Sequence, residues 1–240
     1  MEVWILVNNR AGRQHARENG EQVRRVFALG GARARVAYTD TVEEGAAFLQ
    51  QAVEAQPDLL VCCGGDGTLS QALNVLQQLD AKLPLGYVPM GTTNDFAASL
   101  GLPKEPAKAA EQILHGQPRL LDLGRFGERE FLYVASFGAF TQSSYKAAPQ
   151  VKAVLGHLAY VLESAKELPF LRACSLQVDT GDALYEGEYL FGAVSNTLSV
   201  GGILKLHPQA VHLDDGLLEL TLVRMPKNPV ELGQAAAMLG

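Results

Sequence analysis

The sequence contains few cysteines, and their spacing does not suggest a common site. Among the 240 residues there are three, Cys62, Cys63 and Cys174, with no CxxC spacing. An odd and sparse set of this kind excludes a disulfide framework and argues against a zinc site built from thiolates. Because Cys62 and Cys63 end an apolar run, we expect both to be buried as small hydrophobic residues.

Long apolar runs and basic clusters are also missing. The chain begins with an acid at position 2 and a short apolar run, whereas a signal peptide needs a basic start and a longer apolar region. No stretch approaches the ~20 apolar residues that span a bilayer. The net charge is −6, from 26 acidic and 20 basic residues, so nucleic acid is not an expected partner. We therefore expect a soluble, cytoplasmic protein.

Glycine, in contrast, is abundant. It accounts for 24 of the 240 residues, against a usual share of about 7%. Hydrophobic residues make up 48% and charged residues 19% of the chain, which excludes disorder as the dominant state. The length fits either one large domain or two modest ones.

The first half of the chain alternates between strand and helix patterns. Apolar runs predict strands at residues 3–7, 34–39, 58–63 and 85–88. Helical spacing predicts helices at residues 14–29, 42–55, 68–79 and 96–100. This alternation predicts a parallel sheet with helices on its faces. Ligands of such sheets bind at the carboxyl ends of the strands.

The pattern changes after about residue 123. Strands are predicted at residues 131–137, 175–178, 185–195 and 217–223, with turns at 180–182 and 214–216. One strong helix is predicted at 150–168, and residues 230–239 resemble the beginning of another. This half is therefore predicted to be mainly β and antiparallel. The predicted fold is an α/β domain over residues 1–123 followed by a β-rich, sandwich-like antiparallel domain over residues 124–240.

A glycine-rich turn follows the third predicted strand, where residues 64–68 read GGDGT. Adjacent glycines allow positive φ angles and let a ligand approach the backbone closely. The helix N-terminus behind them, which Thr68 can cap, offers unpaired N–H groups to an anion. This geometry is typical of a phosphate site, but the turn has neither the Lys of a P-loop nor the spacing of GxGxxG.

The carboxylate of Asp66 leaves two interpretations of this turn open. Beside a phosphate its charge would be repelled unless it serves a metal or a proton transfer. The alternative is a tight turn in which the Asp66 side chain caps a backbone amide.

A second turn of similar composition follows the fourth predicted strand, where residues 89–96 read PMGTTNDF. One interpretation is a helix N-cap, with Thr93 or Asn94 starting the helix. Because the two turns follow consecutive strands of a parallel sheet, we expect them to lie side by side and form one polar pocket.

The two turns together resemble a known family. GGDGT at 64–68, followed by PMGTTNDFAASLGLP at 89–103, is similar to the catalytic region of the diacylglycerol kinase and sphingosine kinase superfamily, above all its bacterial soluble lipid kinase branch. Residues 8–12, 135–139, 156–160 and 194–217 resemble further family motifs in the same order. The resemblance implies ATP-dependent transfer of the γ-phosphate to a diacylglycerol-like lipid hydroxyl. The reaction would take place in a cleft between a nucleotide-binding α/β domain and a β-rich lipid-substrate domain.

The resemblance also implies roles for individual residues. Asp66 would be catalytic, organising Mg²⁺ and ATP and helping to deprotonate the lipid hydroxyl. Nucleotide-binding positions would be Thr41, Gly64, Gly65, Asp66, Gly67, Thr68, Gly91, Thr92, Asn94 and Asp95. A structural Mg²⁺ in the second domain would be held by the Asp215 carboxylate and the backbone carbonyls of His212 and Leu217. One carboxylate and two carbonyls suit Mg²⁺, although residues 214–216 also resemble a hairpin turn.

Several positions depart from the family pattern. Ser70 and Gln71 stand where the family has Asn and Glu, Ala46 replaces an acid, and Asn9 replaces a Pro. The family chain also continues into a segment that returns to the first domain with a catalytic acid, and we expect that segment to be missing here. The chain was cut, the protein is a truncated homologue, or catalysis rests on Asp66; the sequence leaves these three alternatives open. The alternative function is therefore a non-catalytic nucleotide- or lipid-binding relative. A soluble-substrate kinase such as NAD kinase shares GGDGT, but residues 92–96 and 214–216 resemble the lipid branch.

The implied partners are ATP and a membrane lipid. The sequence shows no lipidation signal or polybasic stretch, so we expect transient, peripheral membrane contact that depends little on salt. The helix at 150–168 would either pack in the core or form a lip for lipid entry. A homodimer is compatible with the sequence, which does not determine the oligomeric state.

Overall fold

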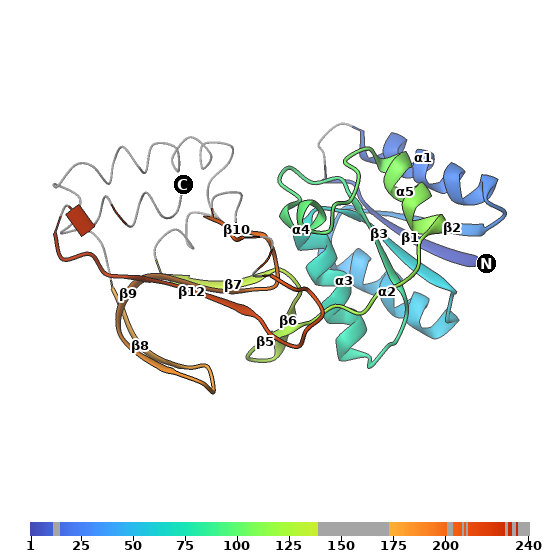
Figure 1. Ribbon diagram of the computed structural model, residues 1–240. Helices are drawn as coiled ribbons and strands as arrows, with labels where there is room; N and C mark the ends of the chain where they lie inside the picture. Colours follow the sequence, from blue (N-terminus) through green and yellow to red (C-terminus); the bar gives the residue numbers. More distant parts are fainter. Residues whose placement is uncertain are drawn as a thin grey trace. The chain divides into compact units, whose positions relative to one another are not determined.

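Figure 1 shows the fold as a computed structural model, which describes residues 1–11, 15–138, 173–200, 204–207, 209, 211–228, 230–231 and 234. Contacts divide the chain into two units, Met1–Tyr133 (unit 1) and Val134–Gly240 (unit 2). This division falls later in the chain than the boundary proposed after residue 123. Each unit is described by itself.

Unit 1 is built on a four-stranded parallel sheet, as predicted. Its strands are β1 (Glu2–Asn8), β2 (Arg33–Thr39), β3 (Leu59–Gly64) and β4 (Leu85–Pro89). The strand order is β2-β1-β3-β4, and every neighbouring pair is parallel. The four apolar runs therefore became the four strands with small shifts at their ends.

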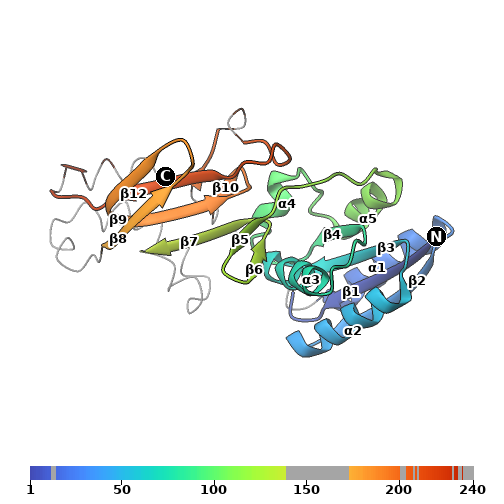
Figure 2. The same ribbon diagram turned by 90° about the horizontal axis from the view of Figure 1, so that it is seen from below.

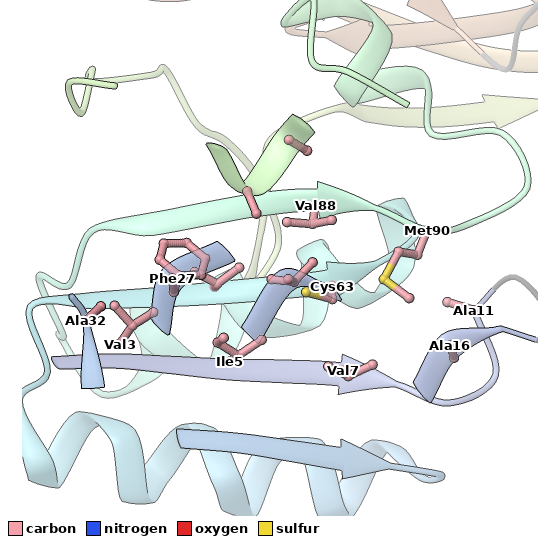
Figure 3. Close-up of a cluster of buried hydrophobic side chains, with 14 residues drawn as sticks. Val3, Ile5, Val7, Ala11, Ala16, Phe27, Ala32, Cys63, Val88 and Met90 are labelled. Carbon is pink, nitrogen blue, oxygen red and sulfur yellow. The ribbon is translucent and has the colours of Figure 1, made fainter. Parts of the chain in front are cut away.

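Helices cover both faces of this sheet (Figure 1). One face packs against α1 (Ala16–Leu29) and α5 (Pro106–His115), and the other against α2 (Val42–Ala55) and α3 (Asp66–Gln78). Successive strand residues point to opposite faces, so Cys62 faces α2 and α3 while Cys63 faces α1 and α5. Figure 3 shows the cluster of buried side chains between the sheet and α1 and α5, which includes Cys63. Both cysteines are fully buried, as predicted, and burial raises the pKa of Cys62 to about 12.

Two elements of unit 1 differ from the sequence-based expectations. Helix α5 was not predicted, although Pro106 at its start and the buried Ala109 and Ala110 are typical of a helix N-terminus and an inward face. The prediction of one continuous strand at 131–137 is wrong. The segment is broken at Leu132 and Tyr133, because both side chains pack into a cluster around the short helix α4 (Asp95–Ser99).

The two parts of that broken strand have different partners. Before the break, β6 (Arg129–Phe131) forms a small hairpin with β5 (Gly124–Phe126). After it, β7 (Val134–Gly138) belongs to unit 2.

Unit 2 contains a four-stranded antiparallel sheet (Figure 2). Its long strand β9 (Leu184–Ser195) pairs with β7, β8 (Cys174–Asp179) and β12 (Glu219–Arg224). A separate two-stranded sheet joins β10 (Ser199–Val200) to β11 (Leu204–Lys205). The antiparallel prediction is confirmed, whereas a second layer that would make a sandwich is not among the described residues.

The two predicted turns of unit 2 have different outcomes. Residues 180–182 join β8 to β9, with Gly181 at a φ of +84°, as predicted. Residues 214–216 precede β12, but within the described residues β12 pairs with β9. The turn itself is present, with Gly216 at a φ of +81°, but residues 211–213 before it form no strand, so the hairpin interpretation of residues 214–216 is wrong.

Some predictions fall outside the described residues. These are the helix at 150–168, with both of its interpretations, the motif at 156–160 and most of residues 230–239. In the part of the chain that the structure describes, no helix is both long enough and apolar enough to cross a membrane.

Candidate functional site

The strand order predicts a ligand-binding crevice at the carboxyl ends of β1 and β3. From β1 the chain passes to β2 on one side, and β3 then lies on the other side of β1. Such a reversal of strand order opens a crevice in which α/β proteins bind ligands. Asn8 ends β1 and Gly64 ends β3. The Asn8 side chain spans this point and donates a 2.8 Å hydrogen bond from Nδ2 to Thr68 Oγ1.

The first glycine turn is shorter than the sequence predicted. Helix α3 begins at Asp66, and the extended Gly65 is its N-cap without any side-chain cap. The Gly65 carbonyl accepts from the backbone N–H of Thr68 at 2.9 Å, so Thr68 already lies inside the first helical turn. The prediction that Thr68 caps the helix is therefore wrong. Its buried hydroxyl instead lies under Gly64, where a Cβ atom would come 2.5 Å from Thr68 Oγ1.

The N-terminus of α3 remains open above this turn. The first N–H groups of a helix have no partner within the helix, and here they belong to Asp66 and Gly67. A Cβ atom added to Gly67 would meet no atom within 4 Å. The backbone of this turn is thus accessible to an anionic ligand.

The second glycine turn lies directly beside the first, as expected. Gly64 pairs with Pro89 across the two strands, and the Met90 N–H donates to the Gly64 carbonyl at 2.7 Å. The two backbones then meet so closely that a Cβ atom on Gly91 would lie 2.6 Å from the Cα of Gly65. Only glycine fits at this contact.

Asn94 fixes the shape of the second turn. Its backbone is left-handed, with φ of 54°. Its side-chain amide bonds to both sides of Gly91, accepting from the Gly91 N–H at 2.9 Å and donating to the Gly91 carbonyl at 2.8 Å. Asn94 is the N-cap of α4, as one interpretation predicted, but its side chain makes no cap bond to that helix. Thr92 and Thr93 are exposed.

The cap of α4 comes instead from Asp66. Its Oδ2 accepts from the Asp95 N–H at 3.0 Å, and its Oδ1 accepts from the Phe96 N–H at 3.3 Å. Asp66 therefore does cap backbone amides, but those of the second turn and not those of a tight turn of its own, and this role does not decide whether Asp66 also serves a metal or a proton transfer. These bonds balance the negative charge of Asp66 and join the two turns.

Two tyrosines that the sequence did not single out touch these acids. The Tyr87 hydroxyl lies 3.4 Å from both Asp66 Oδ1 and Asn94 Oδ1, and burial together with the Asp66 charge raises the pKa of Tyr87 well above its ordinary value. The Tyr133 hydroxyl donates to Asp95 Oδ2 at 2.7 Å, and Asp95 is only 8% exposed. Tyr87 could have been noticed as a hydroxyl within an apolar strand, whereas Tyr133 gave no local signal.

Thr41 and Thr68 line one recess. Thr41 is the N-cap of α2 and forms a capping box with Glu44, accepting from the Glu44 N–H at 3.2 Å. The recess encloses about 80 Å³, space for a few water molecules. Its walls include Asn8, Arg10, Thr41, Gly45, Thr68 and Gln71. Asp66 and residues 91–95 do not line it, so the structure does not bring all the expected nucleotide residues into one pocket.

Two departures from the family pattern have structural explanations. Gln71 Nε2 donates a 2.5 Å hydrogen bond to the Val42 carbonyl of α2, which a glutamate could not do. The Asn9 N–H donates to the Thr39 carbonyl at 2.9 Å, a bond that proline lacks the hydrogen to make.

The expected Mg²⁺ ligands lie on the turn before β12. Asp215 and Leu217 are exposed, and Asp215 Oδ1 accepts from the Leu217 N–H at 3.0 Å. Burial, together with the Asp215 charge, raises the pKa of Glu219. Among the described residues, no three His, Cys, Asp or Glu side chains gather to hold a metal. Two of the three expected ligands are backbone carbonyls, however, and the set consists of oxygens only, which fits Mg²⁺.

Comparison with known proteins identifies the family. Residues 2–126 match the family model of the diacylglycerol kinase catalytic domain. This chain belongs to that family. The matched segment contains both glycine turns and the whole parallel sheet, so the resemblance seen in the sequence is confirmed.

Individual relatives of the diacylglycerol kinase family support the same conclusion. A diacylglycerol kinase of Bacillus subtilis (strain 168) is 34% identical over 221 residues, covering 92% of this chain and 73% of that protein. A diacylglycerol kinase of Staphylococcus epidermidis (strain ATCC 12228 / FDA PCI 1200) is 34% identical over 195 residues, which are 81% of this chain and 61% of that protein. The crystal structure of a diacylglycerol kinase from Bacillus anthracis str. Sterne shares the fold, with a TM-score of 0.76 at 24% identity. That likeness covers 98% of this chain and 77% of the other.

Proposed function

We propose that this chain is an ATP-dependent lipid kinase, transferring the γ-phosphate of ATP to the hydroxyl of a diacylglycerol-like lipid. The observation that carries this proposal is the pair of adjoining glycine turns after β3 and β4, the first of them next to the strand-order reversal, with the open N-terminus of α3 behind them. Membership of the diacylglycerol kinase catalytic domain family supplies the reaction and the class of substrate. Unit 2 would carry the lipid.

The turn residues have complementary roles in this proposal. The N–H groups of Asp66 and Gly67 bind phosphate oxygens, helped by the dipole of α3. Thr41 and Thr68 face the recess beside that helix end. Gly91 and Asn94 hold the second turn against the first, with Asp95 behind them and the exposed Thr92 open to the nucleotide.

Asp66 is the proposed catalytic residue. Phosphoryl transfer depends mainly on positioning and charge neutralisation, and the Asp66 carboxylate already positions α4 through two hydrogen bonds. A carboxylate has about four lone-pair sites, so Asp66 retains capacity to orient the reacting groups.

Labelled ATP tests the proposed reaction. The full chain is incubated with γ-labelled ATP, Mg²⁺ and micelles of diacylglycerol, phosphatidylglycerol or a sphingoid base. We expect labelled lipid with the unchanged protein. The activity of Asp66→Asn should be lower by about 100-fold or more, since the Asn side chain has only one acceptor oxygen for the two N–H groups and carries no negative charge. Asp182→Asn, in the β8–β9 turn, is the matched control and should keep full activity.

The opposite result would support the alternative function. If no lipid is labelled, and Asp66→Asn behaves like the unchanged protein, the kinase proposal is wrong. ATP binding measured by calorimetry without turnover would then identify a non-catalytic nucleotide-binding relative.

A Mg²⁺ site is proposed at the Asp215 carboxylate and the backbone carbonyls of His212 and Leu217. When bound there, Mg²⁺ would supply a positive charge that stabilises this turn of unit 2. We expect added Mg²⁺ to raise the thermal unfolding midpoint of the unchanged protein, and to have no such effect on Asp215→Asn. Asp214→Asn removes the same charge one residue earlier and should respond like the unchanged protein. Equal responses of both variants would disprove this assignment.

The remaining partners are also proposals. ATP and a membrane lipid follow from the kinase function, together with transient, peripheral contact with a membrane.

A further inference from the structure

A short path of hydrogen bonds leads away from Asp66 through a single residue. Asp66 Oδ2 accepts from the Asp95 N–H at 3.0 Å, and Asp95 Oδ2 accepts from the Tyr133 hydroxyl at 2.7 Å. Asp95 is 8% exposed, so its carboxylate depends on hydrogen bonds for its stability. Asp95 thus contacts Asp66 through its own backbone N–H and Tyr133 through its own carboxylate.

Tyr133 occupies a particular place in the chain. It is the last residue of unit 1, and β7 of unit 2 begins at the next position. Its ring packs in the cluster of Leu69 and Phe96, beside the first turns of α3 and α4. The last residue of unit 1 thus donates its side-chain hydrogen bond to the first residue of α4.

This hydroxyl is not needed to attach the chain segment that carries it. Asn74 of α3 already holds that segment by two hydrogen bonds to Glu130. It accepts from the Glu130 N–H at 3.1 Å and donates to the Glu130 carbonyl at 3.0 Å. The side chains of Leu132 and Tyr133 add apolar packing. The Tyr133–Asp95 bond therefore points to a role in α4 itself.

Helix α4 depends on such external contacts. It has only five residues, and isolated helices shorter than about 12 residues are marginal in water. Its N-cap residue makes no side-chain cap bond. The direction of its first N–H groups is thus determined by Asp66 on one side and by Asp95 and its partners on the other.

We infer that Tyr133 is a positioning residue for phosphoryl transfer, whose hydroxyl holds Asp95 so that the first turn of α4 keeps its N–H groups on the Asp66 carboxylate. Tyr133 acts through Asp95 and does not touch the reacting groups. This inference rests on the proposed kinase function for its effect on the reaction, but its structural part does not.

Tyr133→Phe in the full chain tests the inference, because phenylalanine keeps the ring and removes the hydroxyl. We expect the kcat of lipid phosphorylation to fall about tenfold, since a hydrogen bond to a charged group is lost. The KM for ATP should stay nearly unchanged, because the N–H groups of α3 are not affected. Amide hydrogen exchange at Asp95 and Phe96, measured without substrate, should accelerate by about tenfold as their bonds to Asp66 loosen.

Asn74→Ala is the matched control. It removes both bonds to Glu130 but leaves Tyr133 on Asp95, so kcat and exchange at Asp95 and Phe96 should remain those of the unchanged protein. If Asn74→Ala lowers kcat and accelerates exchange at Asp95 and Phe96 as much as Tyr133→Phe does, the hydroxyl only anchors the segment and the inference is overturned. Unchanged exchange at Asp95 and Phe96 in Tyr133→Phe also overturns it.

Failure of the proposed function would look different. An unchanged protein that labels no lipid disproves the kinase proposal, and the exchange measurement then still decides whether Tyr133 positions α4. Normal lipid labelling by both the unchanged protein and Tyr133→Phe would overturn the inference and leave the kinase proposal intact.

Discussion

Single atoms determine how closely the two glycine turns approach one another. Gly65 and Gly91 meet backbone to backbone, and a Cβ atom on Gly91 would also lie 2.7 Å from Asn94 Oδ1. Gly67 differs, because nothing surrounds the position that its Cβ would occupy. Packing within the protein therefore requires glycine at position 91 but not at position 67. A bound phosphate would explain the glycine at 67.

Two alanine variants separate these roles. Gly91→Ala should lower the free energy of unfolding by about 1–3 kcal/mol, because the two turns must move apart. Gly67→Ala should raise it slightly, by up to about 1 kcal/mol, since alanine favours the helix. Urea unfolding measures both changes.

Nucleotide binding provides the second measurement for the same pair. We expect Gly67→Ala to weaken ATP binding by about tenfold or more, measured by calorimetry, because its methyl group covers the N-terminus of α3. A Gly67→Ala protein that binds ATP as tightly as the unchanged protein would show that phosphate lies elsewhere.

At two positions where this chain departs from the family pattern, the residue present makes a hydrogen bond between elements that the family residue could not make. Gln71 joins α3 to the first turn of α2 through the Val42 carbonyl, and Asn9 joins the end of β1 to the end of β2. Both bonds need an N–H donor, which neither glutamate nor proline supplies at these positions. The two hydrogen bonds thus connect the elements that surround the recess at Thr41. Glutamine in place of glutamate at position 71 also removes a negative charge from the wall of that recess.

A glutamate at position 71, as in the family pattern, tests whether the Gln71 bond stabilises the contact between α2 and α3. Gln71→Glu should lower the free energy of unfolding by about 1 kcal/mol, because a carboxylate oxygen would face the Val42 carbonyl without a hydrogen between them. Urea unfolding measures the change. Gln50→Glu, which adds the same charge on an exposed position of α2, should have little effect. Equal stability of the two variants would show that the Gln71 bond contributes nothing.

Charge over the whole molecule limits how the protein can approach a lipid surface. The net charge is −6, and the described part of the chain contains no helix that could cross a membrane. Attraction to anionic lipids requires clusters of basic residues. For the proposed contact with a lipid surface, we therefore expect apolar groups to contribute more than charge, because the sequence has no polybasic stretch.

Vesicle binding tests this expectation for the full chain. Cosedimentation with neutral and with anionic phospholipid vesicles should show weak binding to both. The bound fraction should change less than about twofold between low salt and physiological salt, because the sequence contains no polybasic stretch to attract anionic lipids. Strong binding to anionic vesicles that salt reverses would contradict the expectation.

Local patterns in the sequence determined most of unit 1. Four apolar runs and the helical spacing between them were enough to predict the parallel sheet, because a strand buried on both faces must be apolar throughout. GGDGT and TTNDF were also visible as turns at strand ends, and the strand order placed them side by side. The single strand predicted at 131–137 was wrong because its interruption depends on packing of Leu132 and Tyr133 against α4, which no local spacing reports.

The tertiary structure alone decided what the side chains of the site do. The sequence left Asp66 with two interpretations, and only the approach of α4 showed that its carboxylate accepts from the N–H groups of Asp95 and Phe96. Thr68 looked like a helix cap until the fold placed Asn8 against its hydroxyl. Backbone patterns follow from residues near in the chain, whereas hydrogen-bond partners such as Tyr133 and Asp95 are separated by 38 positions. Burial and strand order bring such partners together, and for that reason the sequence determined the sheet and its turns while the folded chain determined how the turns are held.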